Sequence, residues 1–243
     1  TALMLAAAIL TTIIVGVGLA KLLGLQKRFG ALTGGSVAIC GASAALAIST
    51  ILPKGENHER DTLLTVIGVT AMSTIAMVLY PIVAAQLGMN DTEAGIFLGG
   101  TIHDVAQVVG AGYSVSDSAG DMATLTKLVR VAMLMPVVLI MMIAIKHFYK
   151  AKSQADGAQV PKMPMFLVGF IVLMLLNSFV TLPEVVIETG TQISRFFLVV
   201  SITAIGMKSN LGKLAEVGML PIVMIVAETL WIALLILGYL FAI

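Results

Sequence analysis

Three polar side chains that could handle a proton or a solute stand close together inside a long apolar run: His103, Asp104 and Gln107. Histidine changes charge near neutral pH, a carboxylate can carry a proton, and an amide both donates and accepts hydrogen bonds. On a continuous helix His103 and Gln107 share one face, because they are four residues apart. Ionisable groups inside lipid cost about 3 kcal/mol or more, so they usually face a pathway or a partner. The stretch therefore predicts a path for a solute through a membrane.

A second stretch, residues 33–47, consists mostly of small residues and includes Ser36, Cys40, Gly41 and Ser43. Small residues permit close helix crossing, and on one interpretation the stretch is only a packing interface. The alternative is an unwound break at residues 40–43. The half-helix after such a break has free N–H groups and a partial positive charge, which suit an anion. The spacing alone leaves both interpretations open.

Three further charged side chains lie in apolar surroundings. Lys127 is expected at a membrane interface with its ammonium group in water, as is common for long basic side chains. Arg130 could lie there as well, or it could reach Asp104 or a bound anion, and both alternatives stay open. Glu228 lies in the middle of the last apolar run, where we favour a paired structural carboxylate over a proton carrier.

The composition places these residues in a membrane protein. The chain has 243 residues, of which 59% are hydrophobic and 11% charged, whereas a soluble domain has about 25% charged residues. The net charge of +1 argues against a nucleic-acid partner, which would require a basic patch. The single cysteine, Cys40, excludes an intramolecular disulfide and a cysteine-based metal cluster. His58 and His147 are too scattered to form a metal site, and we expect no cofactor.

The apolar residues form eight runs, each able to cross a bilayer as a helix of roughly 20 residues. The runs cover residues 1–20, 33–52, 62–86, 93–113, 127–147, 164–181, 189–207 and 219–242. Their hydropathy does not alternate, which excludes the strands of a membrane barrel. The predicted fold class is therefore all-α, a polytopic membrane helix bundle with about eight transmembrane helices. Because the first run starts at Thr1, we expect the natural protein to have further helices before it.

Basic residues between the runs predict an orientation, because they are enriched in cytoplasmic loops. With eight continuous spans, nine basic residues fall on one side and two, Lys54 and Arg60, on the other. The nine, expected to be cytoplasmic, are Lys21, Lys27, Arg28, Lys146, Lys150, Lys152, Lys162, Lys208 and Lys213. The loop at residues 53–61, a loop with a short surface helix at residues 114–126, and the C-terminus are then extracytoplasmic. Asp91 and Glu93 fall on the cytoplasmic side.

Several of these motifs together resemble one family, the bacterial inner-membrane proteins named as sulfate exporters. The motifs read Ser36-Val-Ala-Ile-Cys40-Gly41, Ile102-His103-Asp104-Val-Ala-Gln107-Val-Val-Gly-Ala-Gly112, Lys127-Leu-Val-Arg130 and Ala204-Ile-Gly-Met207. The resemblance covers essentially the whole chain. It implies a fold similar to sodium/proton antiporters and bile-acid symporters, with two inverted repeats of five helices and a broken, crossing helix in each. Residues 1–86 would then be the last three helices of the first repeat and residues 87–243 the second repeat. The broken helices would be the second and seventh runs, crossing near residues 40–43 and 201–206.

The resemblance and the residues together predict a secondary transporter for a small anion that works by alternating access and is not an enzyme. Sulfate or a related sulfur oxyanion is suggested by the family's name, with coupling to protons or sodium, and a homodimer is an open alternative. The expected substrate site comprises Ser36, Cys40, Gly41, Ser43, His103, Asp104, Gln107, Arg130, Ser201 and Gly206. An alternative is a cation/proton antiporter that uses Asp104 and Glu228. A membrane-embedded enzyme with a Cys40–His103 couple is a remote alternative, because no general base or cofactor motif accompanies the pair.

Overall fold

The computed structural model describes residues 2–53, 57–152 and 219–242, together with short stretches between residues 169 and 200. Ser201 and Gly206, and most of the runs expected at 164–181 and 189–207, lie outside the described residues. The described part is helical and contains no strand. Its helices are α1 (Ala2–Leu22), α2 (Lys27–Ala38), α3 (Ala42–Ile51), α4 (His58–Gln86), α5 (Asp91–Thr101), α6 (Val105–Val115), α7 (Asp117–Ala132), α8 (Leu134–Lys152) and α12 (Leu220–Ala242).

Within this part, four helical segments are long and apolar enough to cross a membrane: Ala2–Leu22, His58–Gln86, Asp117–Ile145 and Leu220–Ala242. The third of these segments joins α7 and α8. The prediction of a membrane helix bundle is therefore confirmed for these segments, whereas the total of about eight spans stays a prediction.

The second apolar run does not cross the bundle but folds back on itself, and α2 and α3 form a hairpin that we call the first hairpin. At its open end, Nη1 of Arg28 in the first turn of α2 donates to the carbonyl of Pro53, just after α3, at 3.5 Å. Further in, a Cβ at Gly35 of α2 would collide with the side chain of Ile48 of α3. The break interpretation is thus confirmed, at residues 39–41, but the expectation that residues 33–52 run through the bundle as one span is wrong. The expected crossing of this run with the one at residues 189–207 lies outside the described residues.

The fourth apolar run folds back in the same way, and α5 and α6 form the second hairpin. A Cβ at Gly95 near the start of α5 would lie 2.9 Å from the carbonyl oxygen of Ala119 in α7. A Cβ at Gly112 near the end of α6 would lie 3.4 Å from the same oxygen. The start of α5 and the end of α6 therefore lie together, beside the first turns of α7.

The expected outer loop with a short surface helix at residues 114–126 is also corrected, because α7 begins at Asp117 and continues without a break into the expected fifth span. The Ser116 side chain caps this helix by accepting a hydrogen bond from the backbone N–H of Ala119 at 3.0 Å. Serine is a favoured N-cap residue, so the helix start has a local cause. The cap lets α7 follow α6 after a single residue, which keeps the second hairpin packed against α7.

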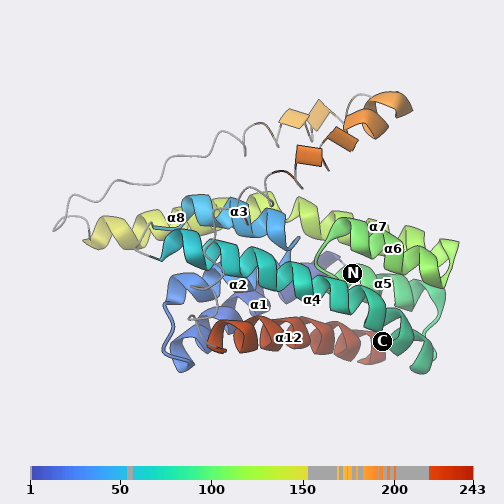
Figure 1. The fold of residues 1–243 in the computed structure, drawn as a ribbon, viewed down its shortest axis with the longest axis horizontal. Coiled ribbons are helices and arrows are strands. Elements are labelled where there is room, and N and C mark those ends of the chain that lie inside the picture. Colours follow the sequence, from blue (N-terminus) through green and yellow to red (C-terminus); the bar gives the residue numbers. More distant parts are fainter. Residues whose placement is uncertain are drawn as a thin grey trace.

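The two hairpins enter the bundle from opposite ends. α4 runs from the open end of the first hairpin to the open end of the second, and in Figure 1 these lie to the left and to the right. The basic residues Lys21, Lys27, Arg28 and Arg60 lie at the first end, where Glu59 and Asp61 are the acidic residues of the first turn of α4. The acidic residues Asp91, Glu93 and Asp117 lie at the second end. Two expectations are therefore corrected: Pro53 and residues 57–61 lie at the same end as Lys21 and Arg28, and Asp91 and Glu93 lie at the opposite end.

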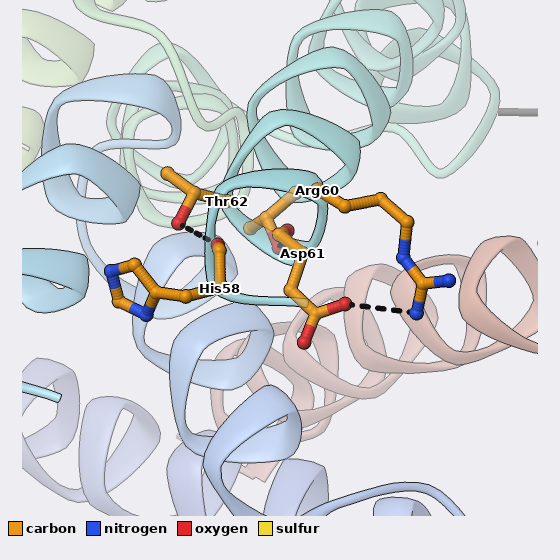
Figure 2. Close-up of polar contacts among 5 residues, drawn as sticks. His58, Arg60, Asp61 and Thr62 are labelled. Carbon is orange, nitrogen blue, oxygen red and sulfur yellow. Dashed lines mark hydrogen bonds and ion pairs between the residues drawn. The ribbon is translucent and has the colours of Figure 1, made fainter. Parts of the chain in front are cut away.

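The start of α4 has the polar contacts of a helix end that faces water (Figure 2). Thr62 Oγ1 donates to the carbonyl of His58 at 2.8 Å, and Nη2 of Arg60 lies 3.4 Å from Oδ1 of Asp61. The Arg60 side chain is 42% exposed, so this ion pair contributes at most about 1 kcal/mol. No group of three histidine, cysteine, aspartate or glutamate residues in the described ranges could hold a metal ion.

α12 connects the two hairpins. It packs against α1 and α2, and also against α4 and α5. Contacts at two glycines show how closely it passes: a Cβ at Gly68 of α4 would lie 2.5 Å from Ile225, and one at Gly100 of α5 would lie 2.6 Å from Ile236. A displacement of α12 would therefore change its packing contacts with both hairpins.

Candidate functional site

The tips of the two hairpins touch in the interior of the bundle. Gly41 at the first tip has a φ of 64°, which disfavours any residue with a Cβ. A Cβ at Gly41 would also lie 3.3 Å from the Cβ of His103 at the second tip, which is tighter than most contacts of this kind. A glycine is needed here both for the turn and for the close approach of His103.

Lys127 of α7 holds the two tips together. Its side chain is fully buried, and Nζ donates to the carbonyl of Ile39 at 2.7 Å and to the carbonyl of Ile102 at 2.9 Å. One acceptor belongs to each hairpin, and each lies just past the last turn of a half-helix, where carbonyl groups have no partner within the helix. The expectation that Lys127 lies at an interface with its ammonium group in water is wrong.

Arg130, one turn further along α7, makes a second bridge of the same kind and is also fully buried. Its guanidinium donates to the carbonyls of Val37 and Ala38 in the first hairpin and of Gly99 and Ile102 in the second, at 2.8–3.2 Å. The carbonyl end of a helix carries a partial negative charge, which explains why two cations are stable here. The possibility that Arg130 reaches Asp104 is not realised. Among the described residues, no carboxylate lies within ion-pairing distance of either cation.

His103 lies in the break between α5 and α6, so it does not share a helix face with Gln107 as expected. The residue is fully buried, and its Nε2 lies 3.1 Å from Oγ1 of Thr229 on α12. Thr229 has one hydroxyl hydrogen, which it can donate to the carbonyl of Ile225 at 2.8 Å. Nε2 is then the donor to Thr229. The other ring nitrogen, Nδ1, is buried and has no hydrogen-bond partner in the described part of the protein.

Asp104 and Gln107 face α4. The Asp104 carboxylate caps α6, accepting from the backbone N–H groups of Ala106 at 2.8 Å and Gln107 at 3.3 Å, while its own N–H donates to Oγ of Ser73 at 2.9 Å. Gln107 Nε2 donates to Oγ1 of Thr74 at 3.0 Å. The amide oxygen of Gln107 is buried without a partner among the described residues.

Three further residues were expected in the substrate site: Cys40, Ser36 and Ser43. Cys40 is buried at the first tip, within electrostatic range of Lys127 and Arg130. Ser36 is buried too, but its hydroxyl donates to the carbonyl of Leu32 within its own helix at 2.5 Å. Ser43 lies in the first turn of α3 and is exposed, so the described structure does not place it with the tips.

Sequence reasoning overlooked Thr229, Ser73 and Thr74 as partners of the tip residues. A lone hydroxyl in an apolar helix carries no signal of its own, because most such groups bond to a carbonyl of the preceding turn. Lys127 and Arg130 did carry a signal. Their spacing of three residues puts both cations on one face of a helix, and this face is directed at the tips.

Taken together, the site is a buried, positively charged junction of two hairpin tips. It offers the unpartnered Nδ1 of His103 and the unpartnered amide oxygen of Gln107. It also offers a third hydrogen on Lys127 Nζ, since an ammonium has three and the structure uses two of them. The positive charge of this junction favours an anion over a cation as a ligand.

Comparison with known proteins agrees with the membrane assignment. Residues 1–225 match the family model described as Conserved hypothetical protein 698. The chain is 51% identical over 233 residues to the UPF0324 membrane protein CT0845 of Chlorobaculum tepidum, covering 95% of this chain and 64% of that protein. It is 50% identical over 230 residues to the UPF0324 membrane protein TauZ of Paracoccus denitrificans, covering 95% of this chain and 68% of TauZ.

A third relative is the UPF0324 membrane protein RB0971 of Rhizobium meliloti, 49% identical over 238 residues, covering 98% of this chain and 69% of that protein. No solved structure matches. The chain spans about two thirds of the length of these relatives. By the extent of the family match and the level of identity, the chain belongs to the family described as Conserved hypothetical protein 698 and is a homologue of the UPF0324 membrane proteins.

Proposed function

We propose that this protein is a secondary transporter for a small anion, such as sulfate or a related sulfur oxyanion. The observation that carries the proposal is the pair Lys127 and Arg130, buried where the hairpin tips meet, with no carboxylate among the described residues within ion-pairing distance of either. Buried charges in membrane proteins usually mark a solute path. An anion would supply the balancing charge, and the third hydrogen on Lys127 Nζ would donate to it. Nδ1 of His103 and the amide oxygen of Gln107 are acceptors, so they would bind a hydrogen that the solute carries.

The arrangement of the hairpins supports alternating access. They enter from opposite ends and meet near the middle, so a solute at the tips could be reached from one end when one hairpin moves and from the other end when its counterpart moves. We propose that they belong to two inverted repeats. We further propose an inner-membrane location in bacteria, with the basic end cytoplasmic and the C-terminus extracytoplasmic, because positive residues favour the cytoplasmic side.

A cation/proton antiporter that uses Asp104 and Glu228 is the second candidate, since Glu228 is a buried carboxylate that has no ion-pair partner in the described ranges. The position of Asp104 weighs against it. The carboxylate already accepts two backbone hydrogen bonds as the cap of α6, which leaves it less available for a metal cation or for a transported proton. The net charge of the junction also repels cations.

The test is the thermal stability of the purified full-length protein in the presence of oxyanions, amino acids and alkali cations. A ligand that binds the folded state raises its stability according to its concentration and affinity. We expect stabilisation by one or more oxyanions, and we expect Lys127→Met to reduce it. Stabilisation by cations alone would contradict the proposal and favour the antiporter.

A further inference from the structure

A second buried polar group lies apart from the hairpin tips, where α12 meets α1 and α2. Glu228 is fully buried there, and its Oε1 lies 2.8 Å from Oγ1 of the equally buried Thr33. A Cβ at Gly16 of α1 would lie 2.6 Å from the same carboxyl oxygen. A Cβ at Gly30 of α2 would collide with the carbonyl of Gly16. The backbones of two helices therefore enclose the carboxyl group, and this approach requires glycines.

The hydrogen bonds of Thr33 suit both protonation states of Glu228. The Thr33 hydroxyl has one hydrogen and lies 3.1 Å from the carbonyl of Phe29 as well as 2.8 Å from Oε1. If Glu228 is ionised, Thr33 donates to the carboxylate. If Glu228 is protonated, its O–H donates to Thr33, and Thr33 donates to Phe29. The contact therefore persists whether or not the proton is present.

The surroundings favour the protonated state in this conformation. Oε2 of Glu228 is buried without a partner among the described residues, and Oε1 has the Thr33 hydroxyl as its hydrogen-bond partner. An ionised carboxylate with so little compensation is strongly disfavoured, whereas a carboxylic acid is tolerated.

The charged groups on the helices around α12 lie at helix ends, apart from His103 at the second tip. Those at helix ends are Lys21 on α1, Lys27 and Arg28 on α2, His58, Glu59, Arg60 and Asp61 on α4, and Asp91 and Glu93 on α5. None of these comes within ion-pairing distance of Glu228 in the described structure.

The next residue on α12 links this site to the tips. Thr229 follows Glu228 directly and contacts His103 of the second hairpin, while Glu228 contacts Thr33 of the first. We propose that Glu228 carries the proton that is coupled to anion movement. It is protonated in this conformation, and its O–H bond breaks, with the proton passing to water, when α12 separates from α2. This inference rests on the proposed transport of an anion and adds its coupling ion.

The experiment compares the full-length wild-type protein, Glu228→Gln and the control Glu93→Gln in proteoliposomes. Glu93 is the half-buried partner in the capping box of α5, a position that glutamine also fits. Counterflow measures exchange of labelled for unlabelled sulfate, and a pH gradient measures accumulation coupled to protons. For Glu228→Gln we expect counterflow within about twofold of wild type and accumulation reduced by about tenfold or more. Glu93→Gln should retain both.

Accumulation by Glu228→Gln at the wild-type level would overturn the inference, and so would loss of both activities in a folded variant, because Glu228 would then be structural. Absence of counterflow in the wild type would instead contradict the proposed transport of sulfate. In that case infrared spectroscopy tests the protonation state of Glu228 independently of transport. We expect the C=O band of a protonated carboxylic acid in the wild type and in Glu93→Gln, and its loss in Glu228→Gln. A wild-type spectrum without this band would overturn the inference.

Discussion

At the scale of single residues, the structure assigns Lys127 and Arg130 to the carbonyl groups that the breaks in the two hairpins leave without helical partners. Each break exposes the carbonyl end of a half-helix inside an apolar bundle, where water cannot satisfy it. The two cations bind carbonyl groups of both hairpins at once. They therefore position the tips. Their positive charge is also the reason for proposing that the junction binds an anion.

Removing the ammonium group of Lys127 should loosen the junction. In Lys127→Met the carbonyl of Ile102 keeps its bond from Arg130, but the carbonyl of Ile39 loses its donor. A buried acceptor without a partner costs about 1–3 kcal/mol, so we expect a lower unfolding temperature in detergent by calorimetry or fluorescence. The control is Lys21→Met at the exposed end of α1, which should change stability by less than about 0.5 kcal/mol. Equal stability of the two variants would contradict the bridging role.

A second pair of variants tests the first tip. Gly41→Ala places a Cβ on a residue with a φ of 64° and brings it 3.3 Å from His103, so we expect a loss of about 1–2 kcal/mol. Gly18→Ala in α1 meets nothing within 4 Å and should be neutral or stabilising by up to about 1 kcal/mol, because alanine favours helix. Thermal unfolding of both proteins measures the difference. If Gly41→Ala is as stable as Gly18→Ala, the tight tip is not required.

At the scale of elements, the two hairpins are the main departure from the sequence-based topology. Residues 33–52 and 93–113 are each apolar and long enough to cross a bilayer, and length does not distinguish a crossing helix from one that turns back. The first break has a visible cause in Gly41. The second, at Ile102–Asp104, contains neither glycine nor proline, and its local signal is Asp104 as a favoured N-cap residue.

Cysteine labelling tests the hairpins directly. In a Cys40→Ala background, single cysteines replace Gln26 and Arg60, which flank the first hairpin, and Gln86 and Ser118, which flank the second. A maleimide that does not cross membranes should label one pair from the outside of intact cells and leave the other pair protected. We expect the pair at 86 and 118 to be labelled, because the basic end is expected in the cytoplasm. Opposite labelling of the positions at 26 and 60 would show a crossing helix and contradict the hairpin.

At the scale of the whole molecule, the sequence predicted the class of the protein and part of the candidate site, but not the way the hairpin tips are assembled. The density of apolar residues was sufficient to identify a membrane helix bundle, and the polar residues 103, 104 and 107 identified one of the two tips. The contact of His103 with Thr229, and of Lys127 with both tips, depends on packing between helices far apart in the chain. A pattern within one helix has no information on such contacts.

The corrected topology also changes which charged residues lie at each end of the bundle. With hairpins in place of crossings, Arg60 moves to the end that already holds Lys21 and Arg28, and the acidic residues Asp91 and Glu93 move to the other end. The separation of charge along the bundle is therefore sharper than the continuous spans predicted. This separation supports the proposed orientation, in which the basic end faces the cytoplasm.

The central claim is that the junction of the hairpin tips conducts a small anion, and counterflow in proteoliposomes tests it most directly. Vesicles containing the full-length protein are loaded with unlabelled sulfate or a related oxyanion and diluted into a trace of the labelled ion. We predict transient accumulation of the label, well above that of protein-free vesicles and reduced in Lys127→Met. Exchange of none of these anions, together with proton flux driven by an alkali cation alone, would contradict the claim.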